Sequence, residues 1–420
     1  LLIILYQMEN LLNMNKNLFL SFLVLLIFYG CTKDFVLQPI SLKTILQSSE
    51  PNLFTSVDGT TYLSFISTDL SSEESKLYFS TLDLDNLKWN KPSLINSSDD
   101  WFVNWADFPR ITANNSNGLS VHYLQKSGED TYSYDIKVMN SNDGGANWNK
   151  PLKLHTDNTK TEHGFVSTIN YNNDFLSTYL DGRQNELAKH DKRIKPQMTL
   201  RSTSYNVDGE ILMDKLIDDR VCDCCQTDLG ITKNNIPITV YRDRSENETR
   251  DIYYSFFKDS FWSVPAVVNN DKWIISGCPV NGPAISTFKN SSSVVWYTEE
   301  EGDSKLKIAF SENIINGFND PILINANDPV GRVDIEMISE TSSLISYMDI
   351  VDGKAYIKVQ KIDNITGNNK FIIIEEISNT RASGFPKINI IDNDKTIITW
   401  TDAKDKYNVK TILLNNSYFD

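Results

Sequence analysis

The run TTYLSFIST at residues 60–68 recurs in character six more times along the chain. Each copy is a short stretch of β-branched and aromatic residues between turn residues, and successive copies begin about 50–62 residues apart. Such a period is typical of the blades of a β-propeller. The seven runs are TTYLSFIST (60–68), GLSVHYLQ (118–125), DFLSTYLDG (174–182), IPITVYRDR (236–244), SSVVWYTEE (292–300), SSLISYMDI (342–350) and KTIITWTDA (395–403).

A second strand-like run follows most of these copies, and then an aromatic residue, usually a Pro and an apolar stretch, as in Trp148–Pro151. Each unit therefore supplies four antiparallel strands, which we name A to D from the axis outward. We predict an all-β fold, a single propeller of four-stranded blades. The second runs are KLYFS (76–80), DIKVMNS (135–141), MTLRSTS (198–204), DIYYSFF (251–257), KLKIAFS (305–311) and YIKVQKI (356–362).

The repeat count favours seven blades, and six blades with an extra hairpin is the alternative. The last unit, 384–414, has runs for A, B and C but ends before a D strand. The segment FVLQPISL (35–42) resembles the missing strand, so we expect this N-terminal strand to close the ring by pairing with the last blade.

The N-terminal region has the pattern of a secretory signal. Lys16 precedes an apolar run over 18–29, which is too short for a comfortable membrane span, and Gly30–Cys31 follows it. This end resembles the lipobox of bacterial lipoproteins, which implies that Cys31 is lipidated; an ordinary N-terminal anchor is the alternative. The expected divisions are an upstream extension outside the fold (1–13), a lipoprotein signal peptide (14–30), a lipid-anchored tether with the ring-closing strand (31–48) and the propeller (49–420).

The charge balance restricts the partners. The chain has 55 acidic and 40 basic residues and a formal net charge of −15, which argues against nucleic acid or an anionic membrane surface. We expect an exported monomer, held in the bacterial cell envelope by its N-terminal lipid alone, whose partner is an acidic glycan or another carboxylated ligand.

Four cysteines remain if Cys31 carries lipid: Cys222, Cys224, Cys225 and Cys278. Export places them in an oxidising compartment, where two disulfides, each stabilising by about 2–4 kcal/mol, are one interpretation. A thiolate site for a soft metal, copper or zinc, is the second, and a redox-active thiol pair is the third. No other cofactor is expected.

The unusual polar segments fall at one end of the predicted blades. In a propeller the D-to-A links and the B–C loops emerge on the same face. The links are NWADFPR (104–110), TEHGFVS (161–167), CDCCQTD (222–228), GCPVNGP (277–283), GRVD (331–334) and RASGFP (381–386), and the richest B–C loops begin at DGR (181–183) and YRDRSENETRD (241–251). This placement predicts a functional site on that face.

Arginines dominate these segments, and their rigid fork suits a carboxylate. The alternative is that Arg–Asp pairs join neighbouring blades. The candidate substrate-binding residues are Arg110, Arg183, Arg201, Arg242, Arg244, Arg250, Arg332, Asp181, Asn281 and Asp334.

SNDGGANW (141–148) matches the pattern S-x-D-x-G-x-x-W and resembles the Asp box, or BNR repeat, of sialidases and related propellers. The resemblance implies a structural turn on the C–D hairpin, opposite the active face. Its residues are Ser141, Asp143, Gly145 and Trp148. The segments CDCCQT, YRDRS-x-x-E-x-RD and GCPVNGPA also resemble a group of bacterial propellers classed as sialidase-like, over roughly residues 100–400.

The sialidase resemblance implies a chemistry in which arginines bind the sugar carboxylate, an Asp is the acid/base and a Glu-assisted Tyr is the nucleophile. FPRI (108–111) is similar in type to the family's Arg-Ile-Pro element, with a different residue order. His163 is a candidate base or metal ligand. The candidate catalytic residues are Asp107, Glu162, His163, Tyr241 and Asp243.

These observations favour a sialidase-like exo-glycosidase acting on a glycan that bears a carboxylate, of the sialic acid type. Two alternatives stay open: a non-catalytic propeller that binds a ligand or a protein, and a periplasmic metal or redox protein built on the cysteines.

Overall fold

The computed structural model describes residues 36–43, 47–69, 71–72, 74–367, 369–404 and 407–420. The chain divides into a unit before Leu37 and a unit from Leu37 to Asp420. The predicted signal peptide and lipidated Cys31 lie outside the described residues, and the fold below is that of the second unit.

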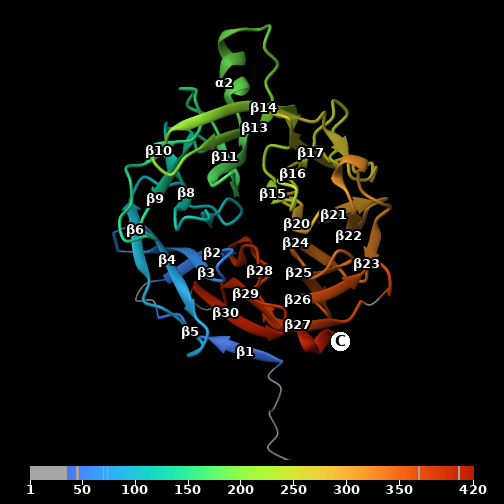
Figure 1. Cartoon of the computed structure of the whole chain (residues 1–420). Helices are drawn as coiled ribbons and strands as arrows, with labels where there is room; N and C mark the ends of the chain where they lie inside the picture. Colours follow the sequence, from blue (N-terminus) through green and yellow to red (C-terminus); the bar gives the residue numbers. More distant parts are fainter. Residues whose placement is uncertain (1–35, 44–46, 70, 73, 368, 405–406) are drawn as a thin grey trace, which may run out of the picture. The chain divides into compact units, whose positions relative to one another are not determined.

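Seven antiparallel sheets surround a common axis (Figure 1). From the inner strand outward, the first three sheets are β2 (Gln47–Thr55), β3 (Thr61–Thr68), β4 (Ser75–Asp83), β5 (Lys88–Trp89) and β6 (Ser93–Ser98); β7 (Ile111–Ala113), β8 (Leu119–Lys126), β9 (Tyr134–Ser141) and β10 (Leu152–Lys153); and β11 (His163–Tyr171), β12 (Asp174–Asp181), β13 (Met198–Tyr205) and β14 (Ile211–Val221). In the first sheet β5 and β6 both pair with β4.

The fourth sheet contains β15 (Asp228–Ile231), β16 (Pro237–Arg242), β17 (Ile252–Lys258), β18 (Phe261–Trp262) and β19 (Ala266–Val267), the last two both paired with β17. The remaining sheets are β20 (Ala284–Phe288), β21 (Ser291–Glu300), β22 (Asp303–Ser311) and β23 (Ile322–Ile324); β24 (Pro329–Met337), β25 (Ser342–Val351), β26 (Lys354–Asp363) and β27 (Phe371–Ile377); and β28 (Lys387–Ile390), β29 (Lys395–Asp402), β30 (Asn408–Asn415) and β1 (Leu37–Ile40).

The fold is thus a seven-bladed propeller of four-stranded antiparallel sheets, as the repeat count favoured, and the six-bladed alternative is wrong. All seven recurrent runs form the second strand of a sheet. In the last sheet β1 is the outer strand and pairs antiparallel with β30, with Leu37 opposite Leu414 and Ile40 opposite Thr411.

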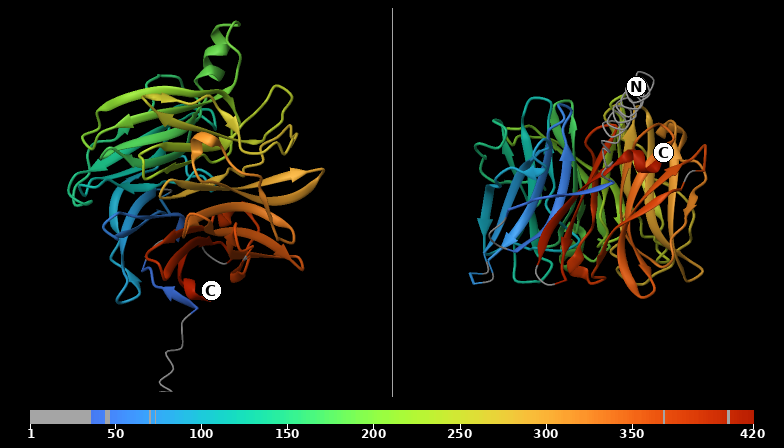
Figure 2. Two further views of the ribbon diagram at one scale, coloured as in Figure 1. Left: turned by 45° about the vertical axis from the view of Figure 1, so that its right-hand side comes forward. Right: turned by 90° about the horizontal axis from the view of Figure 1, so that it is seen from below.

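The core lies between the faces of neighbouring sheets. Figure 2 shows these sheets from two further sides. One cluster joins Val240 of the fourth sheet to Val294 and Trp296 of the fifth, and another joins Val295 of the fifth to Ile345 of the sixth. The second strand of a blade is covered on both faces, so in β21 the residues are buried almost throughout instead of alternately. This double burial is why the seven runs stand out in the sequence.

Helices are confined to the loops of the described chain. The single α-helix there, α2 (Arg183–His190), lies in the loop between β12 and β13, and the 3-10 turns are Ile314–Asn316, Arg381–Ser383 and Asn416–Phe419. Among the described residues, no helix has the length and apolar character of a membrane span.

The SNDGGANW turn connects β9 to β10 and is held by its own side chains. Ser141 Oγ donates to Asp143 Oδ1 at 2.8 Å and accepts from the backbone N–H of Gly145 at 2.9 Å. Asp143 also accepts from the backbone N–H of Asn147 at 2.9 Å. Trp148 packs edge-on against Phe79 of the first sheet. These contacts fit a structural turn. That this turn is an Asp box stays a prediction.

Candidate functional site

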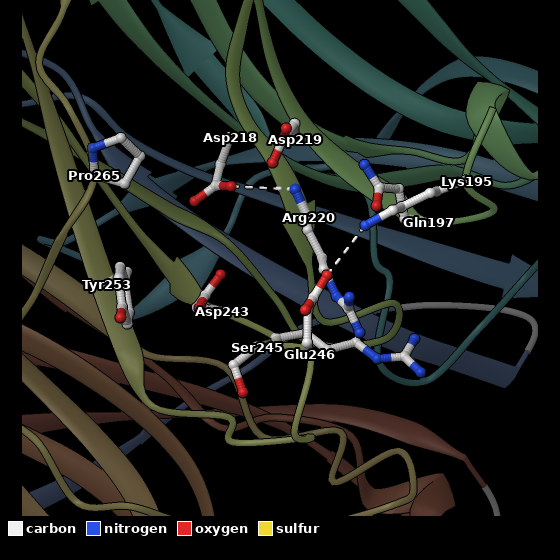
Figure 3. Close-up of a pocket in the computed structure, with 11 residues that line it drawn as sticks. Lys195, Gln197, Asp218, Asp219, Arg220, Asp243, Ser245, Glu246, Tyr253 and Pro265 are labelled. Atoms are coloured by element: carbon white, nitrogen blue, oxygen red, sulfur yellow. Dashed lines mark hydrogen bonds and ion pairs between the residues drawn. The ribbon is translucent and has the colours of Figure 1, made fainter. Parts of the chain in front are cut away.

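A polar cavity of about 630 Å³ opens between the third and fourth sheets (Figure 3). This volume lies in the range of small-molecule sites, about 300–1,000 Å³. Its lining consists of Lys195, Gln197, Asp218, Asp219, Arg220, Asp243, Arg244, Ser245, Glu246, Tyr253 and Pro265.

Three parts of the chain build this cavity. Lys195 and Gln197 belong to the loop that follows α2, Asp218 and Arg220 lie near the end of β14, and Asp243 directly follows β16. The two B–C loops that the sequence marked as the richest, after Asp181 and after Tyr241, therefore meet at one place. A neighbouring cavity of about 210 Å³ shares Lys195, Gln197, Arg220 and Arg244 with it, so the polar surface continues beyond the first cavity.

Asp243 differs from the acidic residues at the same position of other blades. Asp181 and Asp349 follow the equivalent tyrosines of β12 and β25 by two residues, and each is bonded to a cation, Arg183 at 2.6 Å and Lys358 at 2.6 Å. Asp243 has no cation within ion-pair distance in the described part of the chain and faces the cavity. Burial, and then the charge of Asp218, raise its pKa to about 7. A carboxyl group with this pKa can hold a proton at neutral pH and donate it.

Asp218 is held by two hydrogen bonds. The hydroxyl of Tyr241 donates to its Oδ2 at 2.6 Å, and the backbone N–H of Arg220 donates to its Oδ1 at 3.1 Å. Burial raises the pKa of Asp218, and the bond from Tyr241 opposes that rise because it stabilises the ionised form. Tyr241 itself is only 1% exposed, so it reaches the cavity through Asp218.

Cationic groups occupy the other part of the cavity. Lys195 donates to Glu246 at 3.1 Å, and Arg244 pairs with Glu248 and Asp223. The guanidinium of Arg220 has no hydrogen-bond or ion-pair partner among the described residues. Figure 3 shows Asp218, Asp243 and Tyr253 on one side of the view and Lys195 and Glu246 on the other. The cavity therefore combines the carboxyl groups of Asp218 and Asp243 with an unpaired arginine.

A second group of predicted residues lies away from this cavity. Asp107 is buried and accepts from the backbone N–H of Phe165 at 2.7 Å, and burial raises its pKa to about 7. Glu162 accepts from the hydroxyl of Tyr134 at 2.8 Å, and burial raises its pKa to about 8. The structure thus separates Asp107 and Glu162 from Tyr241 and Asp243.

His163 belongs to a third group, with His155. The two rings stack with centroids 3.6 Å apart, and His163 Nε2 lies 3.2 Å from Asp157 Oδ1 and 3.8 Å from Asp181 Oδ1. His155 also contacts Asp135 at 3.3 Å. Arg183 bonds Asp181 in the same group, so that none of these residues faces the cavity.

Most predicted arginines are bonded within the chain. Arg242 donates to the backbone oxygens of Asn281, Arg250 and Tyr297, and Arg332 donates to those of Thr380 and Gly384. The other internal pairs are Arg110 with Asp228, Arg201 with Asp214, and Arg250 with Glu248; Asp334 pairs with Lys387, and Asn281 Oδ1 accepts from the backbone N–H of Arg332. These bonds hold the arginines within the fold, but the two Arg–Asp pairs do not join neighbouring blades: Arg201 and Asp214 belong to one sheet, and Arg110 and Asp228 lie at the second and fourth sheets.

The four cysteines have free thiols. The Sγ atoms of Cys222, Cys224 and Cys225 lie within 4.8 Å of one another, and Arg250 Nη1 lies 3.0 Å from Cys222 Sγ. Cys278 is exposed.

Several cavity residues were not singled out in the sequence: Lys195, Asp218, Arg220 and Tyr253. The signal available was the charged triplet Asp218-Asp219-Arg220 at the end of a strand. Its meaning depends on the neighbouring blade, because Tyr241 of β16 supplies the hydroxyl that holds Asp218.

No protein-family profile and no curated protein matches the chain. Solved structures match it in fold. An ulvan lyase of polysaccharide lyase family PL25, bound to -[GlcA(1-4)Rha3S]-, has a TM-score of 0.53 and 11% identity over 89% of this chain and 95% of its own. The polysaccharide lyase Uly1 has a TM-score of 0.52 and 8% identity over 90% and 92%. A Dyadobacter fermentans protein of unknown function has a TM-score of 0.51 and 13% identity over 90% and 98%.

At these identities the likeness shows the β-propeller fold alone. The resemblance to sialidases, and sialic acid as the substrate, stay predictions. Function must therefore be argued from the cavity.

Proposed function

We propose that the chain is a glycoside hydrolase that cleaves an acidic glycan in the cavity between the third and fourth sheets. The observation that carries this proposal is the difference between its two carboxyl groups. Burial raises the pKa of both: that of Asp243 rises to about 7 with no cationic partner, whereas Asp218 accepts two hydrogen bonds that oppose the rise because they favour its ionised form. Environments that separate the protonation of two carboxyl groups are typical of an acid and a base or nucleophile.

In this mechanism Asp243 donates a proton to the leaving glycosidic oxygen. Asp218 acts as nucleophile or as the base that activates water, and water is added across the broken bond. Tyr241 is a positioning residue, because its hydroxyl is bonded to Asp218 and its ring is buried.

Arg220 is the group we assign to the acidic substituent of the sugar. An unpaired guanidinium beside a cavity fits a carboxylate in a bidentate geometry. Sialic acids and uronic acids both carry such a carboxylate, and a sialidase-like exo-glycosidase is the specific form of the proposal that the sequence resemblance favours.

The test is a panel of fluorogenic glycosides with sialyl, glucuronyl and neutral galactosyl groups, together with acidic polysaccharides. We expect release from a carboxylate-bearing member and none from the galactoside. Because polysaccharide lyases share the propeller fold, products are assayed both for new reducing ends and for unsaturated uronyl ends. Asp243→Asn and Asp218→Asn should each lower kcat/KM by about 10²–10⁴-fold.

Tyr179→Phe is the matched control for Tyr241→Phe. Tyr179 holds the equivalent position in β12, and its hydroxyl bonds Thr203 at 3.1 Å, away from the cavity. Tyr241→Phe should shift the pH profile of kcat/KM, and Tyr179→Phe should not. Unsaturated products would show that the reaction is elimination and not hydrolysis. Binding of an acidic glycan without any cleavage would support the non-catalytic binding propeller instead.

A further inference from the structure

Three sulfur atoms meet outside the proposed glycan cavity, and a fourth cysteine lies in the link after the fourth sheet. Cys222, Cys224 and Cys225 directly follow β14, and their Sγ atoms lie within 4.8 Å of one another, with Cys222 and Cys225 3.4 Å apart. Cys278 comes from the link that precedes β20, and its exposed side chain offers a fourth thiol.

Their spacing suits a single metal ion. With Zn–S bonds of about 2.3 Å, the sulfurs of a tetrahedral zinc site lie about 3.8 Å apart. The distances between these three sulfurs, from 3.4 Å to less than 4.8 Å, bracket that value. Two disulfides would divide the sulfurs into pairs at about 2.05 Å. The three sulfurs instead lie around one point, as a single bound ion requires.

Buried cations beside the sulfurs favour thiolates. Arg250 donates through Nη1 to Cys222 Sγ at 3.0 Å, and its side chain is 3% exposed. Arg242 is 1% exposed, its charge acts on Cys225, and it makes no ion pair within the described residues. Disulfides carry no charge and would leave these guanidiniums beside neutral sulfur. A zinc ion with four thiolates has a net charge of −2, which two guanidiniums offset.

We propose that Cys222, Cys224, Cys225 and Cys278 bind one zinc ion as thiolates. A set of four sulfur ligands around one point selects zinc over harder cations. The ion joins the link before the fourth sheet to the link after it. Cys222 and Cys225 are buried and Cys278 is exposed, so the metal enters and leaves past Cys278.

The test is the metal content of the full chain, purified without chelator and analysed by plasma and native mass spectrometry. We expect one zinc per chain in the wild type and none in Cys224→Ser. Cys278→Ser, at an exposed position, should weaken zinc affinity by more than about 100-fold, measured in competition with a chromophoric chelator. Removing a residue that only hydrogen-bonds to a metal ligand already lowers metal affinity by about 10–100-fold. Cys31→Ser is the matched control and should keep its zinc.

A second measurement does not depend on any variant. Cobalt(II) exchanged into the wild type should show the thiolate-to-metal charge-transfer band of a tetrahedral sulfur site. A zinc-free native mass reduced by the hydrogens of two disulfides would overturn the proposal. Thiols that stay fully reactive after zinc is added would also overturn it, as would copper in place of zinc at the same site.

Discussion

Replacing Asp107 with Asn should flatten the dependence of stability on pH. The Asp107 carboxyl group is buried and accepts one hydrogen bond, from the backbone N–H of Phe165. Burial raises its pKa from 3.8 to about 7 in the folded chain. The folded state therefore keeps the proton to a higher pH than the unfolded state does. Its contribution to stability is full below the unfolded pKa and is lost as the pH rises from about 4 through about 7.

The size of this effect follows from the shift. Each pKa unit corresponds to about 1.36 kcal/mol, so a shift from 3.8 to about 7 corresponds to about 4 kcal/mol in total. Roughly 2–3 kcal/mol of it is lost between about pH 5 and about pH 8. Asn cannot ionise, and its side-chain oxygen still accepts from Phe165, so the variant lacks this loss.

The assay is urea unfolding of the wild type and Asp107→Asn at about pH 5 and about pH 8. Glu50, Glu162 and Glu336 also have raised pKa values, so the wild type loses stability from several groups, and the difference between the two proteins isolates Asp107. We expect the variant to gain about 2–3 kcal/mol relative to the wild type over this interval. Asp143→Asn is the control, because Asp143 lies in an exposed turn and its pKa is lowered. Equal pH slopes for wild type and Asp107→Asn would refute the reasoning.

Three further predictions concern the turn, the arginines and the acid. Gly145→Ala should lower the free energy of unfolding, measured by thermal unfolding, by about 2–4 kcal/mol, because φ is +91° and an added Cβ meets Phe79 Cζ at 2.3 Å. Gly144→Ala is the control: φ is +69° there and the added Cβ meets open space, so the change should cost only about 1–2 kcal/mol in the same assay. Arg242→Met should lower the free energy of unfolding in urea by about 3–5 kcal/mol, because it leaves buried carbonyl oxygens unpaired. Arg220→Met should change this free energy by less than about 0.5 kcal/mol. Equal effects of the two changes would contradict the division into structural and binding arginines. For an acidic glycoside that the protein cleaves, kcat/KM should fall as the pH rises through about 7, because Asp243 acts in its protonated form. A kcat/KM that rises over this pH range would mean that another residue donates the proton.

The blades were predictable from the sequence because their second strands are buried on both faces. Leu344 and Ile345 of β25 are neighbours on opposite faces, and both are fully buried. A run of this kind is visible without knowing any partner strand, so the repeats predicted the order and number of the sheets.

The cavity was predictable only in part. Asp243 was recognised because it belongs to the recurrent run, whereas Asp218 was missed. The pairing of β13 with β14 shifts register between Met198 and Leu200 and again between Leu200 and Arg201. A one-residue shift exchanges the faces of a strand, so alternation along β14 does not tell which of its acidic residues points to the cavity.

The pairing of His155 with His163 was not predicted. His155 lies outside the named strands, yet its ring stacks on that of His163 at the start of β11. This contact depends on how the link between the second and third sheets folds back, which local sequence does not specify.

The most direct test of the glycosidase account is kcat/KM for a carboxylate-bearing glycoside in wild type, Asp243→Asn and Arg220→Met, with unfolding measured on the same samples. The account predicts hydrolysis by the wild type, a loss of at least about 10²-fold in Asp243→Asn at unchanged stability, and a higher KM in Arg220→Met for the acidic substrate. Hydrolysis that survives in Asp243→Asn, or its absence in the wild type on every acidic glycan, would contradict it.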